Sequence, residues 1–291
     1  MLVMAELQAD GSYLAGPPEW PPTELLGSLR RCAGAGTALV GFDFPIGLPE
    51  AYATRAGVDT FPTWLGQLEN RSWDLFRSPA VTPNEICLKR PFYPFRPGGA
   101  SLNQLVAGLR LESKTELMRR CDREAKAAPM FWTLGAKQVG KAALAGWHEV
   151  LRPVLRASDR TAVWPFQGSL ERLLSKGHDI VAETYPASFY RAAGVEKPFG
   201  KKKQPDRKRV APGIQTVAQR AGLVANLALA RAIDDGFGTR ADGENAFDAV
   251  IGLVGMLLVL RGLRPADPPD EPAVRRVEGW MLGLDPATLR R

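Results

Sequence analysis

Two short apolar runs in this chain each end in a carboxylate that is followed at once by a proline turn. The first run is Thr37–Asp43, which leads into Phe-Pro-Ile-Gly-Leu-Pro, and the second is Asp179–Glu183, which leads into Thr-Tyr-Pro. An unpaired carboxylate is costly to remove from water, so an acid at the end of a buried strand needs a reason to be there. In open α/β sheets the functional crevice lies beyond the carboxyl ends of the strands. The pattern therefore predicts an α/β fold with acidic residues at one edge of a sheet.

A third acid lies inside the apolar segment Asn245–Leu260, which we expect to be a buried helix. This acid is Asp248, and Glu244 lies one helical turn earlier, hence on the same face. An acid in so apolar a helix needs a counter-charge or a metal ion. Two interpretations stay open for Asp248: it binds a metal, or it faces solvent in the first turns of the helix.

Carboxylates from two strand ends and one helix suit a centre of two Mg²⁺ or Mn²⁺ ions. These ions prefer oxygen ligands, and a metal-bound water can attack a phosphodiester. We therefore expect Asp43, Glu183 and Asp248 to be catalytic metal ligands, with Glu244 as a further ligand.

The formal net charge of +7 is compatible with a polyanionic partner such as nucleic acid. Residues 196–209 are the most polar stretch, and their like charges together with Pro205 predict a mobile loop. For each basic residue an ordinary solvated charge is the alternative to a phosphate contact. The side chains that we expect to bind phosphates of the substrate are Arg119, Lys137, Lys141, Lys201, Lys202, Lys203 and Arg207.

The chain of 291 residues is expected to form a single domain over residues 1–291, with a mainly helical insertion at about residues 50–165. Three dispersed cysteines and the lack of a secretory signal pattern predict a cytoplasmic protein. The longest apolar stretch, Asn245–Leu260, falls short of the roughly 20 residues that span a bilayer, so no membrane contact is expected.

The segment Gly135–Lys141 matches the pattern G-x-x-x-x-G-K of a nucleotide phosphate loop. Its next residue is Ala142, where the pattern requires the Ser or Thr that holds Mg²⁺. The alternative is a glycine-rich helix start that packs small residues against Trp147.

Several short motifs of the chain resemble those of the predicted nuclease family with a ribonuclease H-like fold that is known as domain of unknown function 429. The resemblance covers roughly residues 1–262, and its short motifs occur in the expected order. The matching segments are Gly41–Pro49 (Gly-Phe-Asp-Phe-Pro-Ile-Gly-Leu-Pro), Arg119–Asp122 (Arg-Arg-Cys-Asp), Gly135–Gly140, Glu183–Pro186 (Glu-Thr-Tyr-Pro) and Phe247–Ala249 (Phe-Asp-Ala).

The resemblance implies a mixed sheet with helices on both faces and an acidic metal centre. It carries the roles of metal ligands over to Asp43, Glu183 and Asp248. In one respect the chain departs from the family pattern: related chains usually begin with a strand that contains Gly-Val-Asp. Here Leu2–Leu7 looks like the second strand, so either the sequence begins late or this member lacks one acid.

Three functions follow from these features. The leading hypothesis is a nuclease that hydrolyses phosphodiester bonds of DNA or RNA with Mg²⁺ or Mn²⁺. The second is an ATP-binding protein of the actin-like branch of the same fold. The third is a non-catalytic nucleic-acid-binding protein, which the missing first-strand acid would favour.

Overall fold

The computed structural model describes residues 1–93, 101–133, 138–157 and 160–289. The chain divides into two compact units, each assembled from separate stretches of sequence. Unit 1 comprises Met1–Gly34, Thr184–Ala266 and Leu282–Asp285, and unit 2 comprises Ala35–Glu183, Asp267–Met281 and Pro286–Arg291. Each unit is described by itself.

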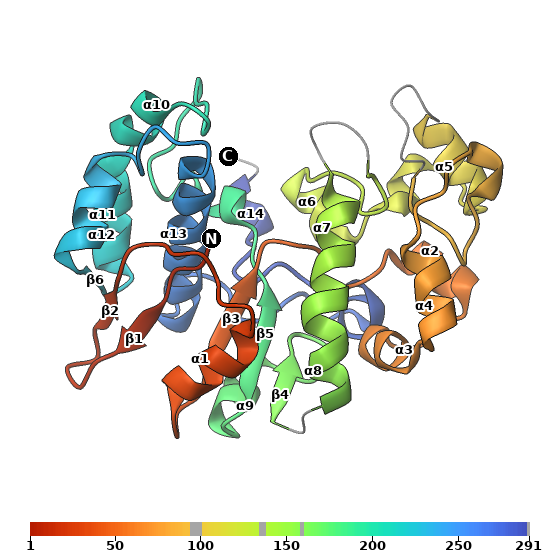
Figure 1. Cartoon of the computed structure of the whole chain (residues 1–291), viewed down its shortest axis with the longest axis horizontal. Coiled ribbons are helices and arrows are strands. Elements are labelled where there is room, and N and C mark those ends of the chain that lie inside the picture. The colour runs from red at the N-terminus through yellow and green to blue at the C-terminus, as the bar shows by residue number, and fades with distance from the viewer. Residues whose placement is uncertain (94–100, 134–137, 158–159, 290–291) are drawn as a thin grey trace. The chain divides into compact units, whose positions relative to one another are not determined.

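The chain is a mixed α/β protein with short strands and many helices (Figure 1). The strands are β1 (Ala5–Leu7), β2 (Tyr13–Ala15), β3 (Leu39–Phe42), β4 (Thr161–Val163), β5 (Asp179–Glu183) and β6 (Leu223–Ala225). The α-helices are α1 (Leu25–Ala33), α2 (Glu50–Ala56), α3 (Phe61–Gln67), α4 (Asn70–Arg77), α5 (Leu102–Gly108), α6 (Arg120–Ala125), α7 (Val139–Gly146), α8 (Arg152–Ala157), α9 (Leu170–Ser175), α10 (Gln204–Arg209), α11 (Ala211–Arg220), α12 (Leu227–Asp234), α13 (Gly243–Leu260) and α14 (Pro286–Leu289). Short 3₁₀ turns span Pro83–Glu85, Lys114–Leu117 and Pro186–Phe189, and π-helical turns span Trp147–Leu151 and Val274–Glu278.

The sheet of unit 2 has the order β3-β5-β4, with both neighbouring pairs parallel. Both strands predicted from the apolar runs are present as β3 and β5, and they lie side by side. All five residues of β5 are buried, as expected for the central strand of a parallel sheet. Phe42 pairs with Glu183, so the carboxyl ends of β3 and β5 meet at the same edge.

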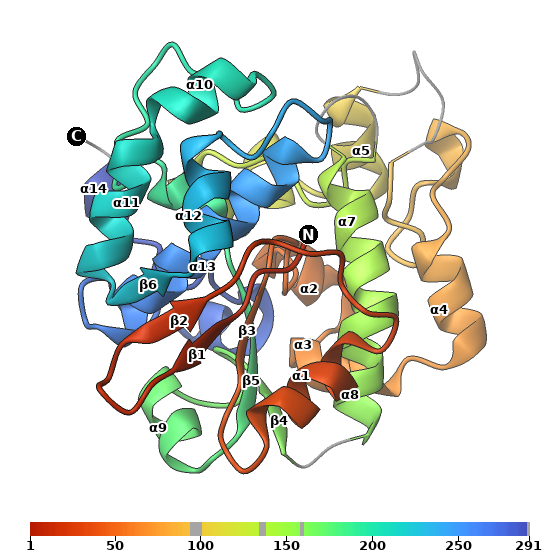
Figure 2. The same cartoon turned by 60° about the vertical axis from the view of Figure 1, so that its left-hand side comes forward.

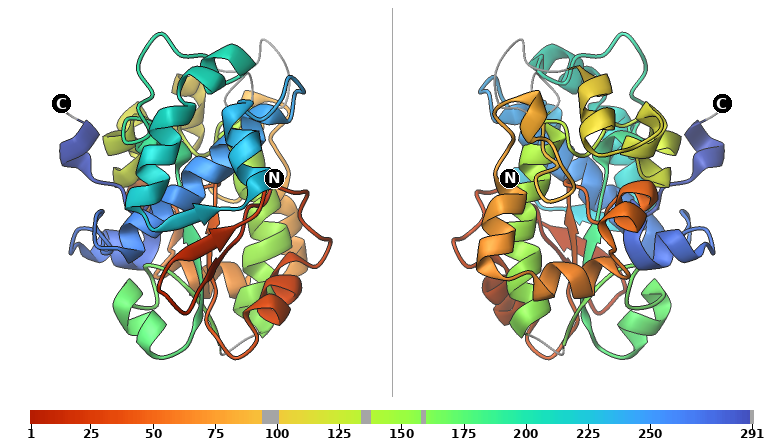
Figure 3. Two further views of the ribbon diagram at one scale, coloured as in Figure 1. Left: turned by 90° about the vertical axis from the view of Figure 1, so that its left-hand side faces the viewer. Right: turned by 90° about the vertical axis from the view of Figure 1, so that its right-hand side faces the viewer.

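Helices α2 to α8 all lie between β3 and β4 in the sequence of unit 2 (Figure 3, right view). Strand β4 was not predicted, because it is only three residues long. Helices α7 and α8 continue into each other through the π-helical turn that begins at Trp147. Gly146 allows helix α7 to pack closely against Phe44, which follows β3, because a Cβ at position 146 would lie 2.3 Å from the ring of Phe44. The Trp147 indole donates to the carbonyl oxygen of Pro45 at 2.7 Å and fixes the turn after β3.

The sheet of unit 1 has the order β1-β2-β6. Strands β1 and β2 form an antiparallel hairpin, whose turn residue Gly11 has a φ of +82°. Helices α11 and α12 contact β6, and α13 runs beside them (Figure 2). Helix α13 is the described helix that is long and apolar enough to cross a membrane by length and composition, and 72% of it is buried inside the structure. It therefore packs as the core helix of unit 1.

The basic segment 196–209 differs from its prediction as a loop, because residues 204–209 form α10. Pro205 lies in the first turn of this helix, where a missing backbone N–H breaks no intrahelical hydrogen bond. Proline here starts a helix and does not prevent one.

Candidate functional site

Two of the predicted site residues lie at the edge formed by the carboxyl ends of β3 and β5 in unit 2. Asp43 follows β3 directly, and Glu183 is the last residue of β5. Glu183 is buried, with 3% of its surface exposed, whereas Asp43 is exposed to solvent. The expectation of a buried carboxylate is therefore confirmed for Glu183 and wrong for Asp43.

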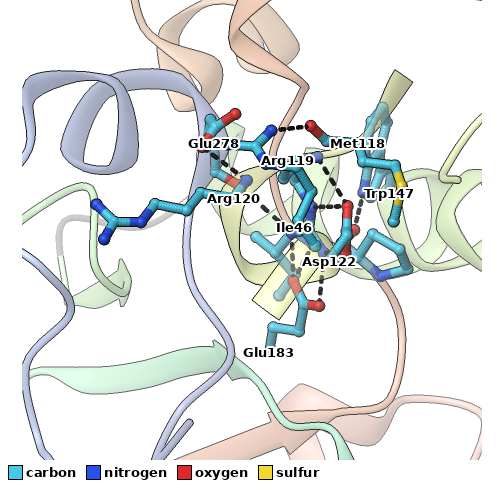
Figure 4. Close-up of polar contacts among 10 residues, drawn as sticks. Ile46, Met118, Arg119, Arg120, Asp122, Trp147, Glu183 and Glu278 are labelled. Atoms are coloured by element: carbon cyan, nitrogen blue, oxygen red, sulfur yellow. Dashed lines mark hydrogen bonds and ion pairs between the residues drawn. The ribbon is translucent and has the colours of Figure 1, made fainter. Parts of the chain in front are cut away.

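The Glu183 carboxylate is bound by the guanidinium of Arg119, which is fully buried (Figure 4). Arg119 Nη1 donates to Glu183 Oε2 at 2.6 Å, and Nη2 donates to Oε1 at 2.8 Å. On its other side the guanidinium reaches Asp122, with Nε 3.0 Å from Oδ2 and Nη2 2.8 Å from Oδ1. One arginine thus holds two carboxylates, each by two hydrogen bonds, which is the strongest geometry for such a pair.

The position of Arg119 follows from the short helix α6 that it precedes. Its own backbone N–H donates to Asp122 Oδ2 at 3.0 Å, so Asp122 caps the helix and pairs with the arginine at the same time. Arg119 Nη1 also lies 3.4 Å from the carbonyl oxygen of Glu278. With this contact all five N–H donors of the guanidinium have an acceptor. Arg119 is therefore a structural counter-ion in this conformation, although the sequence predicted a phosphate contact.

Glu183 accepts a third hydrogen bond, from the backbone N–H of Ile46 to Oε2 at 2.7 Å. This bond ties the end of β5 to the proline turn after β3. Burial raises the pKa of Glu183, and the nearby charge of Asp122 adds to this; the charge and hydrogen bonds of Arg119 offset the increase only in part.

Glu278 is a buried acid of this cluster that the sequence did not single out. Its Oε1 accepts from the backbone N–H of Glu50 at 3.2 Å, and its Oε2 accepts from that of Arg120 at 2.9 Å. These residues begin α2 and α6, so one carboxylate caps two helix N-termini, where negative charge is favoured. Burial raises the pKa of Glu278. An acid between apolar residues in Val277–Met281 was the available signal.

The two predicted acids of unit 1 differ in their surroundings. Asp248 accepts a hydrogen bond from the hydroxyl of Tyr190 on Oδ1 and pairs with the Lys201 ammonium through Oδ2. Glu244 Oε2 is buried without a hydrogen-bond partner among the described residues. The guanidinium of Arg207 is a positive charge that acts on Glu244.

The described residues contain no group of three or more His, Cys, Asp or Glu side chains that could hold a metal ion. Asp43 and Glu183 belong to unit 2, and Asp248 and Glu244 belong to unit 1. The oxygens of Glu183 already accept three hydrogen bonds. Glu183 in this conformation does not fit Mg²⁺ or Mn²⁺, and the centre of three carboxylates stays a prediction.

The predicted phosphate-binding residues fall into two classes. Arg207, like Arg119, is buried and donates to atoms of the chain. Lys202 and Lys203 are exposed, Lys201 pairs with Asp248, and Lys141 is half-buried. Lys137 lies outside the described residues.

The described part of the predicted phosphate loop is engaged within unit 2. The backbone N–H of Gly140 donates to Trp132 at 2.8 Å, and those of Lys141 and Ala142 donate to Gln138 at 3.1 and 3.4 Å. A Cβ on Gly140 would lie 2.8 Å from the carbonyl oxygen of Met130. None of these three amides points to a free phosphate site, which favours the alternative of a closely packed helix start.

Comparison of the chain with protein-family models, with curated proteins and with solved structures finds no match. The resemblance to the nuclease family stays a prediction that rests on its short motifs.

Proposed function

We propose that this chain is a nuclease with a ribonuclease H-like fold, and that it acts at the carboxyl edge of β3 and β5. The observation that supports the proposal is the pairing of Phe42 with Glu183, which places Asp43, the residue after Phe42, at the same edge of adjacent parallel strands as Glu183. This edge is where ligands bind in open α/β sheets.

The two acids would have different roles in such an enzyme. Asp43 is the solvent-facing carboxylate of the edge, so we assign to Asp43 the binding of the substrate phosphate that is cleaved. Glu183, whose carboxylate oxygens accept hydrogen bonds from Arg119 and from the backbone N–H of Ile46, would keep the strand end and the proline turn in place. Mg²⁺ or Mn²⁺ is the proposed cofactor, because two negative groups, carboxylate and phosphate, need a cation between them.

The test is cleavage of labelled single- and double-stranded DNA and RNA, with Mg²⁺, with Mn²⁺ and with EDTA. We expect cleavage that EDTA abolishes and that Asp43→Asn removes. The matched control is Asp270→Asn, which changes an exposed aspartate of the same unit and should leave cleavage unchanged. Equal activity of Asp43→Asn and the wild type would end the assignment.

A second candidate is a non-catalytic nucleic-acid-binding protein, which is favoured because the Glu183 carboxylate is already hydrogen-bonded to Arg119. It predicts binding that weakens with salt and no cleavage under any of these conditions. Measurement of binding and cleavage on the same substrates separates the two candidates. The ATP-binding alternative predicts thermal stabilisation by ATP with Mg²⁺, and the engaged amides around Gly140 count against it.

A further inference from the structure

The basic segment of unit 1 is held in one conformation by its own hydrogen bonds. We call residues 198–209 the lysine turn. Within it, the backbone N–H of Gly200 donates to Asp206 Oδ2 at 2.9 Å, and that of Lys203 donates to the carbonyl of Gly200 at 2.7 Å. Arg209 Nη2 closes the turn on the carbonyl of Pro198 at 2.7 Å. The segment is thus ordered, and its last six residues form α10.

Arg207 fastens the lysine turn to the connection between α12 and α13. Its guanidinium is 1% exposed, with Nε 2.7 Å from the carbonyl oxygen of Gly236 and Nη2 2.6 Å from that of Gly238. Its Nη1 donates to the carbonyl of Lys201. Because all three nitrogens of the Arg207 guanidinium donate to backbone carbonyl oxygens, Arg207 fixes the backbone of the turn. Among the described residues, no carboxylate is hydrogen-bonded to this guanidinium.

Lys201 is fastened a second time through its side chain. The ammonium pairs with Asp248 on α13, and the same carboxylate accepts from Tyr190. The backbone carbonyl and the ammonium of one lysine are therefore both anchored to the core of unit 1. Asp248, predicted as a metal ligand, is in this conformation the anchor of the lysine turn.

The next two lysines are presented to solvent by this arrangement. Lys202 and Lys203 are exposed, and no ion pair joins either of them to another described residue. Later in the turn, Lys208 and Arg209 have acidic partners, Asp235 at 3.3 Å and Asp206 at 3.4 Å. The solvent-exposed positive charge of the turn that has no ion-pair partner among the described residues is thus concentrated at Lys202 and Lys203.

We propose that the lysine turn is a preformed phosphate-binding surface for nucleic acid, in which Lys202 and Lys203 contact the backbone while Arg207 and the Lys201–Asp248 pair hold the turn. This inference rests on the nucleic-acid partner of the proposed function. A turn that is already ordered loses less conformational entropy on binding than a mobile loop of lysines, so it gives more affinity per contact.

The test uses fluorescence anisotropy of labelled duplex DNA and single-stranded RNA with the full chain, in EDTA, over a series of KCl concentrations. Removal of one lysine–phosphate interaction should reduce the slope of log K against log salt by about 0.9 on duplex DNA. We expect Lys202→Gln/Lys203→Gln to reduce it by about 1.8 and to weaken binding. The control Lys114→Gln/Lys176→Gln removes the same charge from exposed positions of unit 2 and should change the slope by much less.

Asp248→Ala distinguishes the effect of losing the Lys201–Asp248 ion pair from the effect of the change in net charge. The change makes the chain more positive, so charge alone predicts tighter binding, whereas loss of the anchor predicts weaker binding. We expect weaker binding with an unchanged circular dichroism spectrum. Tighter binding of Asp248→Ala, or equal effects of the two lysine pairs, would overturn the inference and leave the proposed function standing. A wild-type chain that binds neither nucleic acid would overturn the nucleic-acid partner itself.

Discussion

Replacement of Arg119 by methionine tests whether the buried guanidinium is the counter-charge that the strand-end acid requires. Methionine keeps much of the side-chain length and removes all five N–H donors. It leaves two buried carboxylates, those of Asp122 and Glu183, without the partner that now holds each of them by two hydrogen bonds. The perturbation is therefore electrostatic more than steric.

Removal of one partner from a buried ion pair costs about 3–5 kcal/mol of unfolding free energy, because the remaining charge is left uncompensated. Here two carboxylates lose their partner, which places the expectation at the upper end of this range. Protonation of Glu183, whose pKa burial already raises, limits the cost. We therefore expect Arg119→Met to destabilise unit 2 by about 3–5 kcal/mol at pH 7.

Urea unfolding followed by tryptophan fluorescence is the suitable assay, since all tryptophans except Trp20 belong to unit 2. Arg71→Met provides the control, because Arg71 is exposed and such surface changes stay within about 0.5 kcal/mol. Glu183→Gln and the double variant complete a cycle. If the two residues form a pair, the double variant should lose less than the sum of the single losses, with a coupling of about 0.5–3 kcal/mol. A loss for Arg119→Met no larger than for Arg71→Met, or strict additivity, would refute the reasoning.

Two further predictions concern Glu278 and the turn that it faces. Since burial raises the pKa of Glu278, the folded state keeps its proton to higher pH than the unfolded state. The free energy of unfolding should therefore fall as the pH rises from about 4.5 through the raised pKa of Glu278. Glu278→Gln should make the urea midpoint depend less on pH. A pH dependence equal to that of the wild type would contradict the assignment. Gly47→Ala should strongly destabilise unit 2, because Gly47 has a φ of +140° and a Cβ there would lie 2.0 Å from the carbonyl oxygen of Glu278. Gly57→Ala, with a φ of +68° and nothing within 4 Å of its Cβ, should cost only about 1 kcal/mol in the same urea assay, and equal losses would count against the close approach.

The strands β3 and β5 could be predicted because their signal is local. Each is a short apolar run bounded by glycine or proline, and its terminal acid marks where the strand ends. Their parallel pairing follows once both are strands of an α/β sheet. The three-residue β4 offers too few residues for a pattern, and the helical start at Gln204 was hidden by charge and by Pro205.

The choice of partners could not be predicted in the same way, because it depends on contacts between residues far apart in the sequence. Arg119 binds a carboxylate 64 positions later, and Arg207 binds carbonyls 29 and 31 positions later. No local pattern encodes such distances. Glu278 illustrates the same limit: its role as a double helix cap depends on two helix starts that lie 228 and 158 positions earlier.

The physical rule that singled out Glu183 holds in the structure, but it does not specify the cation. A buried carboxylate requires a counter-charge, and a metal ion or a guanidinium can supply it. Arg119 supplies it here from within the chain, in a geometry that satisfies all five of its donors. A carboxylate bound in this way has little capacity left for a substrate or a metal ion. The proposed function therefore assigns reactivity at this edge to Asp43, which is exposed to solvent. Under that proposal Asp43→Asn should remove activity at a smaller cost in the free energy of unfolding than Arg119→Met, whereas Arg119→Met should reduce activity only through its loss of stability.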